Sequence, residues 1–141
     1  MDEQQFKRRT KQLGLEVIRL VEELPKNRVA DVLGRQLLRS ATSIGANYRA
    51  ACRGKLVADV MSKLGIVEEE ADETTYWMEL WAESNVVSSR QVAPLISEAN
   101  ELLAMTVASI KTLRFKGSLR RWVSVPIIQN PKSKIENSRP R

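Results

Sequence analysis

The chain has 141 residues, 43% of them hydrophobic and 28% charged, which is the composition of one globular domain of ordinary size. It contains no histidine and one cysteine, Cys52. These counts exclude Ser-His-Asp and Cys-His nucleophile arrangements, zinc sites built from Cys and His, and any disulfide framework. We expect no metal and no other cofactor. The surplus of 23 Lys and Arg over 17 Asp and Glu, formally +6, favours an acidic partner.

Four segments repeat apolar or small residues at alternating spacings of three and four, the pattern of amphipathic helices that pack in a bundle. In chain order these seams run from Phe6 to Leu24, from Leu33 to Ala51, from Val57 to Trp81 and from Val92 to Leu113. These seams leave only short connections between the expected helices, and short connections force neighbouring helices to be antiparallel. The sequence therefore predicts an all-α fold, an up-down-up-down antiparallel four-helix bundle over residues 1–115.

Turn and capping residues mark the same divisions. Pro25 cannot continue the first helix, and Asn27 can accept hydrogen bonds from the first free N–H groups of the second. Gly54 is the strongest breaker between the second and third segments. Ser84 and Asn85 close the third helix, and Ser88 with Gln91 has the form of a capping box for the fourth.

The helical pattern fails beyond Phe115, where glycine, three prolines and a polar run predict a disordered or extended basic tail over residues 116–141. This tail holds seven basic residues and one acidic residue, so it accounts for the whole net charge. The rest of the chain is neutral but polarised, because residues 1–55 carry 12 basic and 6 acidic side chains and residues 56–115 carry 4 and 10.

The N-terminus is polar and lacks the apolar stretch of a secretion signal. The longest uncharged stretch, residues 122–131, is far shorter than the roughly 20 apolar residues that span a membrane. We expect a soluble cytoplasmic protein with no membrane partner, and we interpret Cys52 as a packing residue.

Basic residues of the first two helices are candidates for nucleic-acid contact. Arg39, Arg49 and Arg53 are separated by nearly whole numbers of helical turns, so they return to roughly related faces, where guanidinium groups can bind phosphates. No aromatic residues interleave with them, so contacts to phosphate and shape would dominate. The candidate residues are Arg8, Arg9, Lys11, Arg39, Arg49, Arg53, Lys55, Arg120 and Arg121. Two alternatives stay open: ion pairing of the helix residues with the acidic third helix, and a purely solubilising tail.

The third helix carries an acidic run, residues 68–73, and an aromatic group. A di-iron site in such a bundle needs Glu-x-x-His pairs, which are absent, so the run is interpreted as a solvated face. Tyr76 and Trp77 lie 100° apart on a helix, so Tyr76, Trp77 and Trp81 cannot all point inward. These three residues predict a homo-oligomer interface.

Two motifs together carry a family resemblance. Residues 36–53 (QLLRSATSIGANYRAACR), followed by KLGIVEEEADE at 63–73 and YWMEL at 76–80, resemble the four-helix-bundle proteins encoded in 23S rRNA intervening sequences. The resemblance covers the chain to about Phe115. One departure is Leu56, where the family tends to have a serine that caps the third helix, so this cap is missing.

The resemblance implies a small all-α protomer, a ring-like homopentamer and no known catalytic activity. The family is similar to the accessory variability protein of diversity-generating retroelements, a basic pentamer that associates with a reverse transcriptase and nucleic acid. Arg39, Asn47 and Arg53 match motif positions, and whether they hold the assembly together or contact RNA stays open.

Two functions follow as hypotheses. The first is a non-enzymatic oligomeric scaffold that binds structured RNA or DNA through basic surfaces. The alternative is a protein-interaction module or structural ring, such as an accessory partner of a reverse transcriptase, that makes no direct nucleic-acid contact. We expect no enzymatic activity, since an Arg-x-His ribonuclease site is excluded by the absence of histidine.

Overall fold

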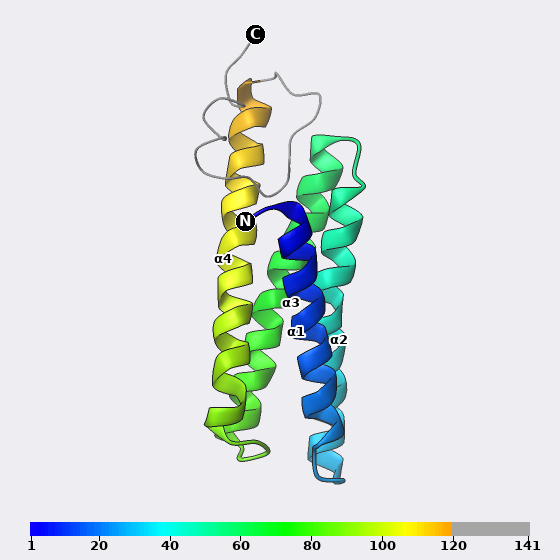
Figure 1. Ribbon diagram of the computed structural model, residues 1–141, viewed down its shortest axis with the longest axis vertical. Helices are drawn as coiled ribbons and strands as arrows, with labels where there is room; N and C mark the ends of the chain where they lie inside the picture. The colour runs from blue at the N-terminus through cyan, green and yellow to red at the C-terminus, as the bar shows by residue number, and fades with distance from the viewer. Residues whose placement is uncertain (120–141) are drawn as a thin grey trace.

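The computed structural model describes the backbone of residues 1–119 and the side chains of residues 1–116. It contains four helices: α1 (Glu3–Glu22), α2 (Arg28–Cys52), α3 (Val57–Glu83) and α4 (Ser89–Leu119). They alternate in direction along the bundle (Figure 1), which confirms the predicted up-down-up-down four-helix bundle. Helix α4 continues four residues past Phe115, where the apolar pattern ends. The remaining tail, including Arg120 and Arg121, lies outside the described residues.

The helices begin at residues that can satisfy their free N–H groups, with one exception. Asn27 accepts a hydrogen bond from the Ala30 N–H at 2.9 Å, and Ser88 and Gln91 bond reciprocally, as predicted. A second capping box, between Asp2 and Gln5, starts α1. Helix α3 has Leu56 at its N-cap and no side-chain hydrogen bond there, as the sequence led us to expect.

The predicted seams supply the core. The largest fully buried apolar side chains come from all four helices and include Phe6, Leu13, Leu37, Tyr48, Leu64, Trp81 and Leu102. The rings of Phe6 and Tyr48 join α1 to α2 with centroids 4.3 Å apart. None of the helices described is long and apolar enough to span a bilayer.

Helix α1 is the shortest of the four, with 20 residues against 31 in α4. It packs chiefly on α2 and only lightly on α4, so one side of α1 is well supported and the other is sparsely covered. Small residues let α1 and α2 approach closely. A Cβ built on Gly45 would lie 3.2 Å from Thr10 Oγ1, and one built on Gly14 would lie 3.9 Å from the Thr42 Cα.

Candidate nucleic-acid interface

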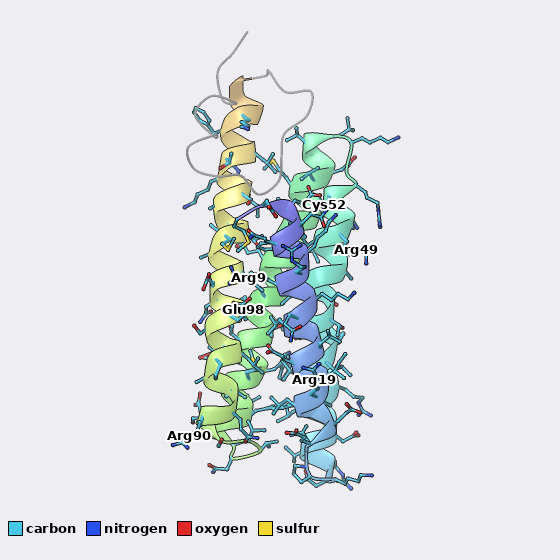
Figure 2. All side chains as sticks on the ribbon, in the orientation of Figure 1. Arg9, Arg19, Arg49, Cys52, Arg90 and Glu98 are labelled. Carbon is cyan, nitrogen blue, oxygen red and sulfur yellow. The ribbon has the colours of Figure 1, made fainter. Side chains whose placement is uncertain are left out.

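A groove of about 580 Å³ runs along the outer side of the contact between α1 and α2. Its lining contains four cationic side chains and no carboxylate: Lys7, Arg8 and Lys11 of α1 and Arg49 of α2. The remaining lining residues are Gln4, Thr10, Gly14, Leu15, Ile18, Thr42, Gly45 and Ala46. Figure 2 shows Arg49 on the α2 side of α1. Three of the predicted nucleic-acid residues, Arg8, Lys11 and Arg49, are therefore brought together.

Helix geometry explains why these cations share one groove. Lys7 and Lys11 are four residues apart, so they lie on the same face of α1, with Arg8 beside them. Helix α2 runs antiparallel to α1, and Thr10 lies against Gly45. Because Arg49 is one turn beyond Gly45, it reaches the part of the groove where Lys7 lies.

The three predicted residues in the groove are exposed and available to a ligand. Within residues 1–116, no carboxylate lies within ion-pair distance of Arg8, Lys11 or Arg49. Lys7 pairs with Glu3 at 3.3 Å, one turn away on its own helix. Such an exposed ion pair contributes little to the stability of the protein and breaks easily, so Lys7 can also turn toward an anion.

Arg9 points away from the groove. Its guanidinium donates to both oxygens of Glu98, at 2.6 and 2.8 Å, and contacts Glu101 at 2.9 Å, between α1 and α4 (Figure 2). The hydrogen bond to Glu98, more than any other contact, raises the pKa of Arg9. The prediction that Arg9 contributes to a nucleic-acid surface is thus corrected: adjacent residues lie 100° apart on a helix, and Arg9 joins two helices.

Arg39 is also engaged inside the protomer. It pairs with Glu70 at 3.3 Å and with Glu73, both on α3, and the bond to Glu73 is the main cause of its raised pKa. Glu73 also accepts a hydrogen bond from the Trp77 indole at 3.1 Å, and this bond is the largest influence lowering the Glu73 pKa. The alternative of pairing with the acidic third helix is confirmed for Arg39.

The prediction that Arg39 and Arg49 lie on related faces of α2 is wrong. Ten residues are about 2.8 turns, which leaves these side chains roughly 80° apart around α2. That rotation directs Arg39 toward α3 and Arg49 toward α1. Arg53, one turn beyond Arg49, is exposed at the end of α2, and Lys55 is exposed in the following turn. Neither lines the groove.

The three predicted interface aromatics differ in exposure. Tyr76 is 54% exposed and makes an edge contact with Trp77, which is half-buried, with ring centroids 5.0 Å apart. Trp81 is fully buried within one protomer. The prediction that Trp81 lies at a subunit interface is therefore corrected. Trp81 belongs to the regular repeat of apolar residues along α3 that faces the core. The role of Tyr76 and Trp77 stays a prediction.

Two other predicted residues have local roles. Asn47 donates from Nδ2 to the Ser43 carbonyl at 2.9 Å, so its amide is bonded within α2. Cys52 is half-buried, and burial is the main cause of the raised pKa of its thiol, which makes it a poor nucleophile. Among the residues described, no group of three or more acidic or cysteine side chains could hold a metal ion.

Neither the groove nor the contribution of Lys7 and Leu15 to its lining was predicted from the sequence. Lys7 had a detectable signal, since it stands one turn before Lys11. Ile18 belongs to an apolar stripe beside the core seam of α1, and Leu15, three residues before it, extends that stripe.

The family model of the 23S rRNA-intervening sequence protein matches residues 2–108. A crystal structure of a protein of unknown function from Bacteroides thetaiotaomicron, described as a member of the S23 ribosomal protein family, is similar with a TM-score of 0.71 and 31% identity. The alignment covers 75% of this chain and 98% of that one. No curated protein matches. Because the family match extends across nearly the whole bundle and confirms the resemblance in residues 36–80, this chain belongs to the 23S rRNA-intervening sequence protein family.

Proposed function

We propose that this protein is a non-enzymatic scaffold that binds structured nucleic acid, RNA or DNA, through phosphate contacts centred on the α1/α2 groove. One observation carries the proposal: the groove gathers Lys7, Arg8, Lys11 and Arg49 and contains no carboxylate. The bundle is neutral overall, so this local surplus is a property of one face.

The ion pairs elsewhere in the protomer strengthen this argument. Arg9 and Arg39 are each held by two carboxylates, so they contribute little to the field outside the protein. The cations of the groove are not neutralised in this way. A polyanion approaching the bundle therefore meets its strongest attraction along α1 and α2, and Arg53 and Lys55 extend this surface toward the end of α2.

The experiment is a salt series of binding to a labelled structured RNA, comparing Arg49→Ala with Arg90→Ala. Both residues are exposed arginines, but Arg90 lies near the start of α4, at the opposite end of the bundle from Arg49 (Figure 2). We expect affinity to fall steeply with salt, and Arg49→Ala to weaken binding and reduce the slope of log K against log[salt] by about 1. Arg90→Ala should leave both unchanged. An affinity that does not depend on salt would refute the proposal.

The proposal includes assembly into a homo-oligomer, with the family resemblance favouring a pentamer. Its support in the protomer is Tyr76, a large aromatic side chain that is 54% exposed in the second half of α3. Light scattering should report a particle of several 16.0-kDa chains, five for a pentamer. Tyr76→Glu should reduce that mass, and Val29→Glu, at an equally exposed apolar residue of α2, should not. A monomeric wild-type protein would refute this part.

The same aromatic pair favours a second candidate, a protein-interaction module that makes no nucleic-acid contact, for example a partner of a reverse transcriptase. Tyr76 and Trp77 stand in an acidic helix, a setting that suits a basic protein surface better than a phosphate backbone. Capture of a partner that survives nuclease treatment, together with no shift of RNA or DNA in a gel, would favour this candidate over the first.

A further inference from the structure

We infer that the α1/α2 groove holds an unpaired segment of the structured nucleic acid, with phosphates at its cationic end and the face of a base on Leu15 and Ile18, so that the protein prefers single-stranded to double-stranded regions. This inference rests on the proposed function and adds the class of nucleic acid that the groove recognises.

The groove has two chemically different ends. Lys7, Arg8 and Lys11 occupy the first half of α1, and Arg49 faces them from α2. Leu15 and Ile18 follow one and two turns further along α1 and line the other end. The groove is therefore cationic along the first half of α1 and apolar along the second half, and Lys11 and Leu15 at the boundary are one turn apart.

The apolar end is exposed to solvent. Leu15 and Ile18 are 39% and 37% exposed, although the α1 seam already supplies Leu13, Val17 and Leu20 to the core. A ligand that covers both ends must carry negative charge and an apolar face within one short unit. A nucleotide of an unpaired strand has both, because its phosphate is anionic and its base is free of stacking neighbours.

The floor of the groove permits close approach of such a strand. Gly14 and Ala46 present little or no side chain, and a Cβ built on Gly14 would have no neighbour closer than 3.9 Å, so the hollow reaches close to both helix backbones. Helices in contact have axes about 8–10 Å apart, so the hollow between their outer surfaces is narrower than a duplex. A duplex can touch the cationic rims, but its bases are stacked and paired and cannot reach Leu15 and Ile18.

A neighbouring groove of about 620 Å³ at the turn between α1 and α2 lacks this single sign of charge. Its lining includes Glu22 and Asp31 beside the basic residues Lys26, Arg28 and Arg35. Asp31 pairs with Arg35 at 3.2 Å. The uniform charge is thus a property of the first groove and not of every hollow between these helices.

The test compares two labelled probes at equal salt: a 12-nucleotide RNA without self-complementarity, and the same RNA in a duplex with its complement. The proteins are full-length wild type and Ala46→Leu, which fills the groove at an exposed helical position without changing charge. The matched control is Ala104→Leu, at an exposed alanine of α4. Circular dichroism checks that each variant remains helical.

We expect the wild type to bind the single strand about tenfold more tightly than the duplex, because a base that covers Leu15 and Ile18 removes their apolar surface from water. Ala46→Leu should lose most of that preference and keep its duplex affinity, and Ala104→Leu should behave as the wild type. Leu15→Ser should reduce single-strand affinity by a few fold for the same reason. Equal affinity for the two probes, or an unaltered preference in Ala46→Leu, would overturn the inference while leaving the proposed function intact. Failure of both probes to bind would overturn the proposed function as well.

Discussion

Two glycines of the bundle show how differently single residues are constrained. Gly54 lies in the turn after α2, and a Cβ built there would lie 2.7 Å from Val60 Cγ2 and 3.2 Å from the Ala51 carbonyl oxygen. Gly65 lies within α3, and a Cβ built on it would meet nothing within 4 Å in the protomer. The first glycine makes room for a tight connection, whereas the second only weakens a helix.

Gly65→Ala should therefore stabilise the protomer. Alanine is favoured over glycine in a helix interior by about 1 kcal/mol, and the free volume around Gly65 removes any steric penalty. Urea unfolding should show a higher midpoint with an unchanged slope. As the contrasting variant, Gly54→Ala should lose about 1–3 kcal/mol, because stiff Val60 and the backbone must move. A Gly65→Ala protein less stable than wild type would contradict the prediction.

Glu73 gives a pH-dependent contribution to stability. Its carboxylate accepts hydrogen bonds from Trp77 and Arg39, and its pKa in the folded state is lowered from the ordinary 4.5. A lowered pKa means that this contribution is complete above pH 4.5 and is lost as the pH falls through the folded-state value. Glu73→Gln should thus be less stable at pH 7, by about 1 kcal/mol or less for a partly exposed pair. The difference from wild type should shrink as the pH falls below 4.5, and a difference that stays constant would refute the prediction.

At the scale of the helices, the start of α3 is the weakest of the four N-termini. Leu56 has the extended conformation of an N-cap, with φ −101° and ψ 143°, but its side chain makes no cap hydrogen bond. It is also 65% exposed, so it does not compensate by packing.

Leu56→Ser should stabilise the protein by about 1 kcal/mol, because the hydroxyl can accept from the free N–H groups at the start of α3. Leu56→Ala is the control, since it removes the same exposed side chain without adding an acceptor. Thermal unfolding of the three proteins should rank the serine variant highest. Equal stability of the serine and alanine variants would show that the cap does not form.

The positions of the helices could be predicted from the sequence because the spacing of three and four between apolar residues is a local pattern. The same residues form the core of the bundle. Asn27, Ser88 and Gln91 were identified for the same reason, as their bonds reach three residues along the chain. The direction of each arginine could not be predicted in this way. Arg9 and Arg39 find carboxylates 89 and 31 or more residues away, and only the packed bundle sets those distances.

For the molecule as a whole, we expect nucleic-acid binding and stability to depend on different residues, as the neighbours Arg8 and Arg9 illustrate. Arg8 lines the α1/α2 groove, and Arg9 joins α1 to α4 through Glu98 and Glu101. Arg9→Ala should destabilise the bundle by about 1–2 kcal/mol, because two carboxylates lose a partly buried partner, and should alter nucleic-acid affinity little. Arg8→Ala should do the reverse. Urea unfolding and RNA titration of both variants give the comparison, and matching losses in the two variants would refute this division.

The light packing of α1 on α4 has a kinetic consequence. The α1/α2 groove exists only while α1 lies on α2, and α1 has the least support from the rest of the bundle. We therefore expect α1 to open locally before the other helices do. Its backbone amides should take up deuterium before those of α2, α3 and α4. A ligand held across α1 and α2 closes that opening, so slower deuterium uptake along α1 would report occupancy of the groove without any label on the ligand.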